Sequence, residues 1–198
     1  MAGENEREAS GAELVIAGGG LIGLACALEA AGSGLEVLVV DPGADGRASE
    51  VAAGMIAPVG EASWGEEALL AAALDSAGRW PDWAERLGAE GGGDVGYRRC
   101  GALHVGLDRD EAAELRRRHE LHGQFGLESD WMGARACRRL EPGLSPDVAG
   151  GYVAPGEGEV DPRRVTTALR SACERAGVRM RAGSVASVRL SDGGVRGV

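Results

Sequence analysis

A short apolar segment near the start of the chain runs directly into glycines, and small residues follow at once. The segment reads Glu13-Leu-Val-Ile-Ala-Gly-Gly-Gly-Leu-Ile-Gly23. This order predicts a β-strand, a tight turn and a helix over Leu21–Ala31. In such a turn Gly18 lets the strand reverse, Gly20 leaves room for an approaching group, and Gly23 lets the helix pack closely on the strand. Because the first N–H groups of a helix attract anions, the turn predicts a phosphate-binding site.

A second apolar segment indicates what kind of phosphate compound suits this turn. Leu35–Val40 predicts another strand, and it ends in Asp41, about 20 residues beyond Gly20. A carboxylate at that distance accepts a hydrogen bond from the ribose of a bound dinucleotide, and the N–H groups of Leu21–Gly23 face its pyrophosphate. The G-x-G-x-x-G spacing alone is a weak signal. In this context it predicts a dinucleotide-binding βαβ unit.

The chain beyond Asp41 does not read as the next βαβ crossover of an NAD-binding unit. A loop over residues 42–47 leads into Ala48-Ser-Glu-Val-Ala-Ala-Gly-Met-Ile-Ala-Pro58. This block resembles the flavin-contacting segment of the FAD-dependent amino acid oxidases, most closely the glycine oxidases of thiamine biosynthesis. Their pattern is Ala-Ser, a variable residue, three small residues and Gly-Met. Glu50 occupies the variable place, and Val51 replaces the first small residue.

The resemblance continues through three more segments in the same order, 101–108, 140–146 and 156–162. It implies FAD as the cofactor, with Met55 also bordering the substrate space. Val185 matches the family position whose backbone meets the adenine, on an expected strand over Val185–Leu190. The residues assigned to FAD by the turn and the resemblance are Gly18, Gly20, Leu21, Ile22, Gly23, Asp41, Ala48, Ser49, Ala53, Gly54, Met55 and Val185.

The resemblance also implies a fold and a domain organisation. The expected class is α/β, with a Rossmann-like FAD-binding domain of the glutathione-reductase type and an inserted α+β substrate domain that is incomplete here. By analogy, residues 1–85 and 155–198 build the FAD-binding domain, and residues 86–154 begin the substrate domain. Family members are nearly twice as long and bind the substrate carboxylate through an arginine of their second half. We therefore expect a truncated chain that is inactive alone.

The activity implied is oxidation of the C–N bond of glycine or a small amino acid to the imine, with oxygen as acceptor. The cofactor carries the hard step, so no catalytic acid, base or nucleophile is expected. Two alternatives stay open. One is a relative of the sarcosine oxidases or D-amino acid dehydrogenases, and the other is a flavin-binding remnant without turnover. The residues leave open which amino acid is oxidised, which acceptor takes the electrons, and whether the full-length protein is a homo-oligomer.

Charge and composition argue against several other classes. The formal net charge of −10 gives no electrostatic attraction to nucleic acid or acidic membranes. No apolar run approaches the roughly 20 residues of a membrane-spanning helix. The polar, acidic start, Met1–Glu8, is unlike a signal peptide and is expected to fray up to Glu13. These features predict a cytoplasmic protein.

The residue types that bind metals are scattered. The 4 cysteines are widely spaced without a C-x-x-C pair, and we expect buried or half-buried free thiols. His119 and His122 are expected on the solvated face of a helix, and His104 in a strand. Because no carboxylate or cysteine cluster joins them, no metal site is expected.

The remaining pattern predicts helices and strands beyond the first βαβ unit. Pro81 is expected to kink or split the first of these helices. In chain order the elements are a helix over Glu66–Leu87, a loop over Gly88–Gly93, a strand over Tyr97–Leu107, a helix over Arg109–Gln124 capped by Asp108, a short strand near Trp131, a helical turn over Ala134–Leu140, a strand over Gly151–Ala154, a helix from Asp161–Pro162 to Ala176, and strands over Val178–Arg181, Val185–Leu190 and from Val195, with a turn at Ser191–Gly194.

Overall fold

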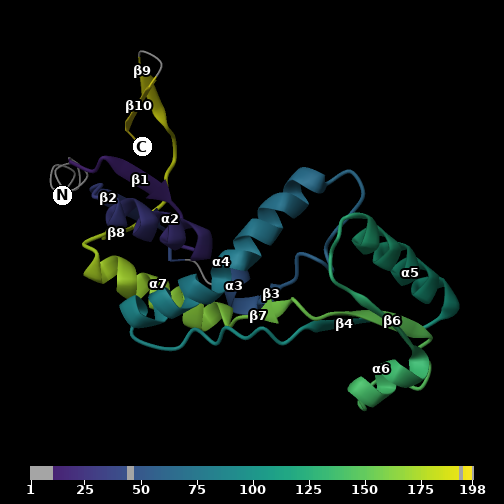
Figure 1. Ribbon diagram of the computed structural model, residues 1–198. Coiled ribbons are helices and arrows are strands. Elements are labelled where there is room, and N and C mark those ends of the chain that lie inside the picture. Colours follow the sequence, from purple (N-terminus) through teal and green to yellow (C-terminus); the bar gives the residue numbers. More distant parts are fainter. Residues whose placement is uncertain (1–10, 44–46, 192–193, 198) are drawn as a thin grey trace. The chain divides into compact units, whose positions relative to one another are not determined.

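The computed structural model describes residues 11–43, 47–191 and 194–197. It divides into two compact units, each assembled from separate stretches of the chain (Figure 1). Unit 1 comprises Met1–Ala53, Ala84–Val95 and Asp161–Val198, and unit 2 comprises Gly54–Trp83 and Gly96–Val160. The domain bounds implied by the resemblance, 1–85 with 155–198 against 86–154, stay a prediction.

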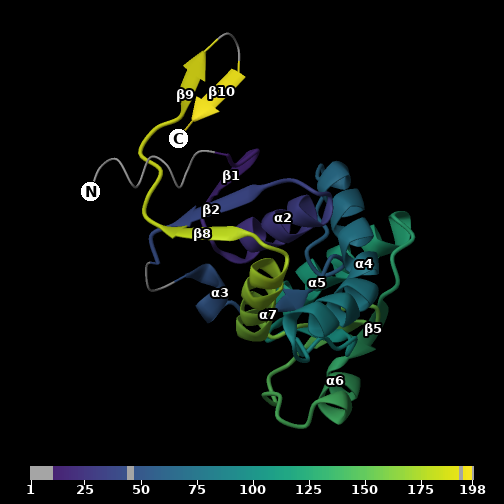
Figure 2. The same cartoon turned by 90° about the vertical axis from the view of Figure 1, so that its left-hand side faces the viewer.

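Unit 1 contains a parallel sheet in the order β1-β2-β8, visible in Figure 2. Its strands are β1 (Leu14–Ala17), β2 (Val37–Asp41) and β8 (Arg179–Ala182). The connecting helices α2 (Leu21–Gly32) and α7 (Pro162–Arg175) pack against each other, and α2 also contacts β1 and β2. Parallel strands joined by helices are the arrangement that the first βαβ unit predicts. The α/β class is therefore confirmed.

Burial explains why these residues form the core of unit 1. β2 is a continuous apolar run, and its residues from Val37 to Val40 are all buried. Such runs are typical of parallel strands covered on both faces. Helix α2 brings Leu24 into contact with α7, where the Cys173 thiol donates to the Leu24 carbonyl at 3.3 Å. Thus α2 and α7 bury small and apolar residues against each other.

The start of α7 follows the prediction from sequence. The Asp161 carboxylate accepts hydrogen bonds from the backbone N–H groups of Arg163 (3.0 Å) and Arg164 (3.2 Å). Pro162 occupies the first turn, where its missing N–H leaves no hydrogen bond unmade. The carboxylate and the proline together fix where α7 begins.

The C-terminal part of unit 1 corrects one prediction. The prediction of a strand over Val185–Leu190 is wrong for the first half of that range, because residues 184–188 have no regular structure. The strand β9 (Arg189–Ser191) begins only where it pairs with β10 (Gly194–Gly197). A strand needs a hydrogen-bonded neighbour, and Val185 has none among the described residues. Residues 192–193 of the predicted turn, 44–46 of the predicted loop, and the acidic start at 1–10 lie outside the described residues.

Unit 2 is built on an antiparallel sheet of three strands, in the order β4 (Ala102–Gly106), β6 (Gly150–Ala154) and β5 (Asp130–Gly133). Helix α5 (Arg109–Gln124) packs on this sheet, and the short α6 (Ala134–Leu140) contacts β5 and β6. A cluster of buried residues around Tyr152 forms the core under α5. Two further strands of unit 2, β3 (Met55–Ile56) and β7 (Gly158–Glu159), form a separate antiparallel pair.

Helix α4 (Glu67–Gly91) is longer than predicted. It runs without a break through Pro81, and the expected loop at Gly88–Gly93 begins only after Gly91. Trp80 lies edge-on to Trp83, with ring centroids 5.0 Å apart, and stacks on Tyr97 at 6.2 Å. The helix is continuous across Pro81, so the predicted split is wrong, and the alternative of a kink at this residue stays a prediction. By contrast, the strand observed in the predicted range Tyr97–Leu107 is shorter than predicted, because only β4 forms there.

Two predictions about polar side chains need correction. His122 lies on α5 as expected, but its side chain is fully buried rather than solvated, and His119 is half-buried. Both histidines share the hydroxyl of Ser129, at 2.9 Å and 2.8 Å from their Nδ1 atoms. This shared partner draws them inward. Among the thiols, which are all free, Cys26 and Cys100 are exposed, contrary to expectation, whereas Cys137 and Cys173 are buried.

Two kinds of structure, a membrane-spanning helix and a metal-binding cluster, are absent from the described part of the chain. None of its helices combines the length and apolar character needed to cross a bilayer. Within the same residues, no group of three or more histidine, cysteine or carboxylate side chains is placed to hold a metal ion.

Candidate functional site

The glycine turn between β1 and α2 is held by the backbone of the sheet. Gly18 has a φ angle of +102°, which side-chain-bearing residues rarely adopt. Its N–H donates to the carbonyl of Val40 at 2.8 Å, which fixes the end of β1 against β2. The strand reversal predicted at Gly18 therefore depends on a glycine.

Gly23 and Gly20 differ in what surrounds them. A Cβ atom at Gly23 would lie 2.0 Å from the carbonyl oxygen of Gly18, so α2 packs on the turn only with glycine there. A Cβ atom at Gly20 would meet no protein atom within 4 Å. The packing of this chain therefore requires glycine at position 23. At position 20 it leaves open space.

The first turn of α2, which follows Gly20, offers backbone donors and carries no acidic side chain of its own. Gly20 precedes the helix in an extended conformation and supplies no side-chain cap. The first intrahelical hydrogen bond runs from Leu24 N–H to the Gly20 carbonyl at 2.9 Å, so the N–H groups of Leu21–Gly23 have no partner within the helix. No acidic residue lies in the first turn. Donors, dipole and open space suit a phosphate.

Asp41 ends β2 beside this turn and is held by Arg47. The Nη2 atom of Arg47 donates to Oδ2 of Asp41 at 2.5 Å, and Nη1 donates to the carbonyl of Gly19 at 2.8 Å. The backbone N–H of Gly43 reaches Oδ1 of Asp41 at 3.4 Å. A Cβ atom at Gly19 would lie 2.7 Å from Oδ2 of Asp41, so the carboxylate sits directly against the glycine turn.

The pKa of Asp41 reflects this environment. Burial raises the pKa, but this effect is outweighed by hydrogen bonds from Arg47, Gly43 and Gly19 and by the charge of Arg47, which all lower the pKa. The net pKa lies below the ordinary value of 3.8. Asp41 is therefore ionised at neutral pH and can accept hydrogen bonds from hydroxyl groups.

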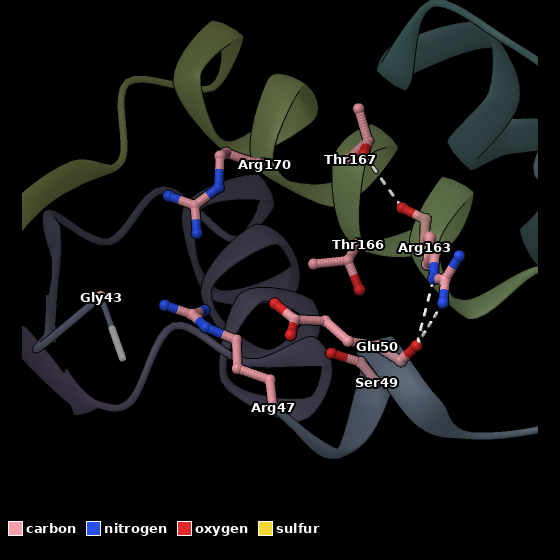
Figure 3. A pocket seen from close by; sticks show the side chains of 8 residues that line it. All are labelled: Gly43, Arg47, Ser49, Glu50, Arg163, Thr166, Thr167 and Arg170. Atoms are coloured by element: carbon pink, nitrogen blue, oxygen red, sulfur yellow. Dashed lines mark hydrogen bonds between the residues drawn. The ribbon is translucent and has the colours of Figure 1, made fainter. Parts of the chain in front are cut away.

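The first part of the predicted flavin segment forms α3 (Ala48–Val51) in unit 1. Arg163 of α7 anchors it by donating to the Glu50 carbonyl from Nε (3.1 Å) and Nη2 (2.9 Å). Figure 3 shows the pocket between α3 and α7, which is lined by Gly43, Arg47, Ser49, Glu50, Arg163, Thr166, Thr167 and Arg170. Ser49 lines this pocket, whereas the side chains of Ala48 and Ala53 are exposed.

The remaining predicted site residues lie in different places. Gly54 and Met55 belong to unit 2, where the Gly54 carbonyl accepts a hydrogen bond from Val160 N–H at 2.9 Å. Gly54 has a φ angle of +81°, and Met55 is 68% exposed. Val185 belongs to unit 1 but lies outside any strand. The structure thus brings the glycine turn and Asp41 together, and the roles assigned to all these residues stay predictions.

Two residues near these positions have contacts that the sequence did not indicate. Arg47 was placed only in a loop, although it bridges Asp41 and the glycine turn. Glu157 lies in a segment that resembles the family, yet no role followed from that resemblance. Its side chain is 1% exposed and accepts a hydrogen bond from the backbone N–H of Gly60. An arginine six residues after the strand-ending carboxylate was the available signal for Arg47, whereas nothing local predicts burial of a glutamate.

The glycine turn, the parallel sheet and the carboxylate at the end of β2 are together the features of a dinucleotide-binding fold. Comparison with known proteins identifies the family. The model of the DAO family, described as FAD dependent oxidoreductase, matches residues 13–198, and the chain belongs to this family.

Individual relatives agree with this assignment. The chain is 34% identical over 173 residues to the bifunctional protein ThiO/ThiG of Synechocystis sp., covering 86% of this chain and 24% of that protein. It is 31% identical over 167 residues to a glycine oxidase of Geobacillus kaustophilus, covering 83% and 44%. A crystal structure of glycine oxidase from Geobacillus kaustophilus matches with a TM-score of 0.85 and 30% identity, over 90% of this chain and 48% of that one. The chain therefore spans less than half the length of these relatives.

Proposed function

We propose that this chain binds FAD and forms the cofactor-binding part of an amino acid oxidase. The expected reaction is oxidation of the C–N bond of glycine or a small amino acid, with oxygen as acceptor. Membership of the FAD-dependent family supports the cofactor, and similarity to glycine oxidases supports the substrate class. A role in thiamine biosynthesis and a cytoplasmic location belong to the same proposal.

The observation that carries the proposal is the open space above Gly20. A glycine that the protein's own packing does not need lies at the start of α2, beside donors without a helical partner. Gly18, Gly20 and the N–H groups of Leu21–Gly23 would hold the pyrophosphate, and Asp41 would accept the ribose hydroxyl. The resemblance adds Ala48, Ser49, Ala53, Gly54, Met55 and Val185 as further contacts to the cofactor.

The chemistry divides between cofactor and protein. FAD, held by the glycine turn and Asp41, would supply the hydride acceptor for oxidation of the substrate, and oxygen would take up the electrons. The protein would bind and orient the cofactor and the substrate. The predicted site residues accordingly include no catalytic acid or base. Exposed Met55 would supply an apolar, flexible wall beside the substrate.

The test compares FAD with NADP as ligands of the purified chain. Arg47 beside Asp41 makes NADP an informative competitor, because an arginine at this place can accommodate a 2′-phosphate. We expect FAD to bind with a saturable change in flavin fluorescence, and NADP to be unable to displace it at tenfold excess. Displacement of FAD by NADP, or binding of NADP alone, would contradict the proposed cofactor.

A further inference from the structure

Unit 2 contains a buried carboxylate that the proposed FAD contacts do not use. Glu157 is 1% exposed and directly precedes β7. Taking an ionised carboxylate out of water costs several kcal/mol unless hydrogen bonds replace the lost hydration. The groups that satisfy Glu157 therefore indicate what this side chain holds in place.

Among the described residues, the carboxylate of Glu157 has two polar partners, which come from different segments. Its Oε1 atom accepts a hydrogen bond from the backbone N–H of Gly60 at 2.5 Å, and its Oε2 atom lies 3.4 Å from Nε2 of His104. The ring of His104 stacks on fully buried Tyr152, with centroids 4.7 Å apart, so the histidine is fixed from its other face. Glu157 thus joins the loop at Gly60 to β4 of the core sheet.

Gly60 is fitted closely into this cluster. A Cβ atom there would lie 2.4 Å from Cε1 of His104 and 3.2 Å from Oε1 of Glu157. Only a residue without a side chain lets the backbone reach the carboxylate. The short hydrogen bond from Gly60 to Glu157 is therefore a specific feature of this loop.

The loop held by Glu157 continues directly from the strand that carries Met55. β3 has only two residues, with Met55 opposite Glu159 and Ile56 opposite Gly158. The Gly54 carbonyl accepts from Val160 N–H at one end, and Gly60 N–H donates to Glu157 at the other. So short a strand pair is weakly held by its own ladder. The carboxylate of Glu157 provides a second anchor for the segment 54–60.

We infer that Glu157 is a positioning residue, which fixes the segment 54–60 through Gly60 and thereby sets the place of Met55. Met55 is 68% exposed, so packing of its own side chain contributes little to its position, which depends on how the segment 54–60 is anchored. The anchoring stands on contacts within unit 2. Its consequence for the flavin rests on the proposed function, because only the resemblance places Met55 beside the cofactor.

The first experiment measures amide hydrogen exchange in the chain without FAD. Glu157→Ala removes the acceptor, and we expect exchange at residues 55–61 to rise about tenfold or more, while β6 stays unchanged. Glu157→Gln keeps a neutral acceptor, and the rise should be only about twofold to threefold. The control is Glu159→Gln, which removes the exposed ion pair with Arg98 from the same strand pair and should leave exchange at 55–61 unchanged.

The outcomes of this experiment are distinct. A rise confined to 55–61 supports the anchor. Unchanged exchange there, or an equal rise throughout unit 2, would show that Glu157 is only a core residue and would overturn the inference. If Glu157→Ala does not fold, Glu157→Gln decides in the same way, by whether its smaller rise is confined to the segment.

The second experiment uses FAD and the visible circular dichroism of the bound flavin. In Glu157→Ala we expect the flavin signal to change while the dissociation constant for FAD stays within about threefold, because the pyrophosphate contacts proposed at the glycine turn are untouched. If hydrogen exchange at residues 55–61 rises but the flavin signal stays unchanged, the link between this segment and the cofactor would be overturned. Failure of the wild-type chain to bind FAD would instead refute the proposed function. The hydrogen-exchange result would still test whether Glu157 anchors the segment 54–60.

Discussion

Arg47 and Asp41 form an ion pair that joins the end of β2 to the glycine turn. One terminal nitrogen of Arg47 lies 2.5 Å from Oδ2 of Asp41, and the other donates to the Gly19 carbonyl at 2.8 Å. The side chains are 20% and 18% exposed, so solvent screens this pair less than an ordinary surface pair. The carboxylate proposed to receive the ribose is thereby held in one orientation.

Arg47→Met should reduce the stability of unit 1 at neutral pH by about 1 kcal/mol, through loss of a charge-assisted hydrogen bond. Because the pKa of Asp41 is lower in the folded state, its contribution is present above pH 3.8 and is lost as the pH falls below that value. The variant should therefore lose less stability than the wild type between about pH 4 and pH 2. Urea unfolding at a series of pH values measures this difference.

Arg79→Met is the matched control, because it removes an ion pair with Asp75 whose side chains are 75% and 64% exposed. That substitution should leave stability within about 0.5 kcal/mol of the wild type. Equal effects of the two arginine substitutions would mean that the bridge at Arg47 stabilises nothing beyond an ordinary surface pair.

The two glycines of the turn should respond differently to alanine. Gly23→Ala should destabilise unit 1 by about 2 kcal/mol or more, because its methyl group would collide with the Gly18 carbonyl. Gly20→Ala should change stability by less than about 1 kcal/mol, since its methyl group enters open space. Gly32→Ala is the control, because Gly32 also lies in α2 and a Cβ atom added there would likewise meet no atom within 4 Å. Thermal unfolding of the three variants tests this order, and similar losses at positions 20 and 23 would disprove it.

Met55 should affect the flavin without affecting the fold. Met55→Ala removes a side chain that is 68% exposed, so stability should change by less than about 0.5 kcal/mol. If Met55 lies beside the flavin as proposed, the visible spectrum of the FAD complex should shift. Leu69→Ala, at a residue 64% exposed in unit 2, provides the comparison and should leave the spectrum unchanged. Identical flavin spectra for Met55→Ala and the wild type would remove this residue from the site.

His122 should make unit 2 sensitive to mild acid. Burial lowers the pKa of His122 below 6.5, and neighbouring His119 lowers it further, against smaller opposing effects of Val59 and Glu157. The unfolded chain binds a proton more readily, so stability present above about pH 6.5 is lost as the pH falls below it, by up to about 1.4 kcal/mol per pH unit. His122→Gln should flatten the dependence between pH 7 and pH 5. Equal slopes for the two proteins in denaturant titrations would show that His122 does not titrate on unfolding.

Local sequence signals predicted much of unit 1. The apolar run of β2, the glycine spacing before α2 and the Asp161–Pro162 entry to α7 each act within a few residues, so the sequence indicates them directly. The burial of His122 was misjudged because its ring packs edge-on against Tyr152 of β6, a contact with a distant segment. The split at Pro81 was also wrong, whereas a kink there stays a prediction. Whether a segment forms a strand depends on a neighbouring strand with which it can pair, and Val185 has no such neighbour among the described residues. The ion pair of Arg47 and the burial of Glu157 likewise depend on contacts that no local pattern reveals.

Binding of FAD by the wild-type chain and by Gly20→Val is the most direct test of the central claim. The valine side chain would occupy the open space above the turn, where the pyrophosphate is proposed to lie, without colliding with protein atoms near its Cβ. Equilibrium titration followed by flavin fluorescence should show saturable binding to the wild type and at least a hundredfold weaker binding to the variant, with both proteins folded by circular dichroism. Equal affinity of a folded Gly20→Val variant for FAD would contradict the assignment of the glycine turn to the cofactor.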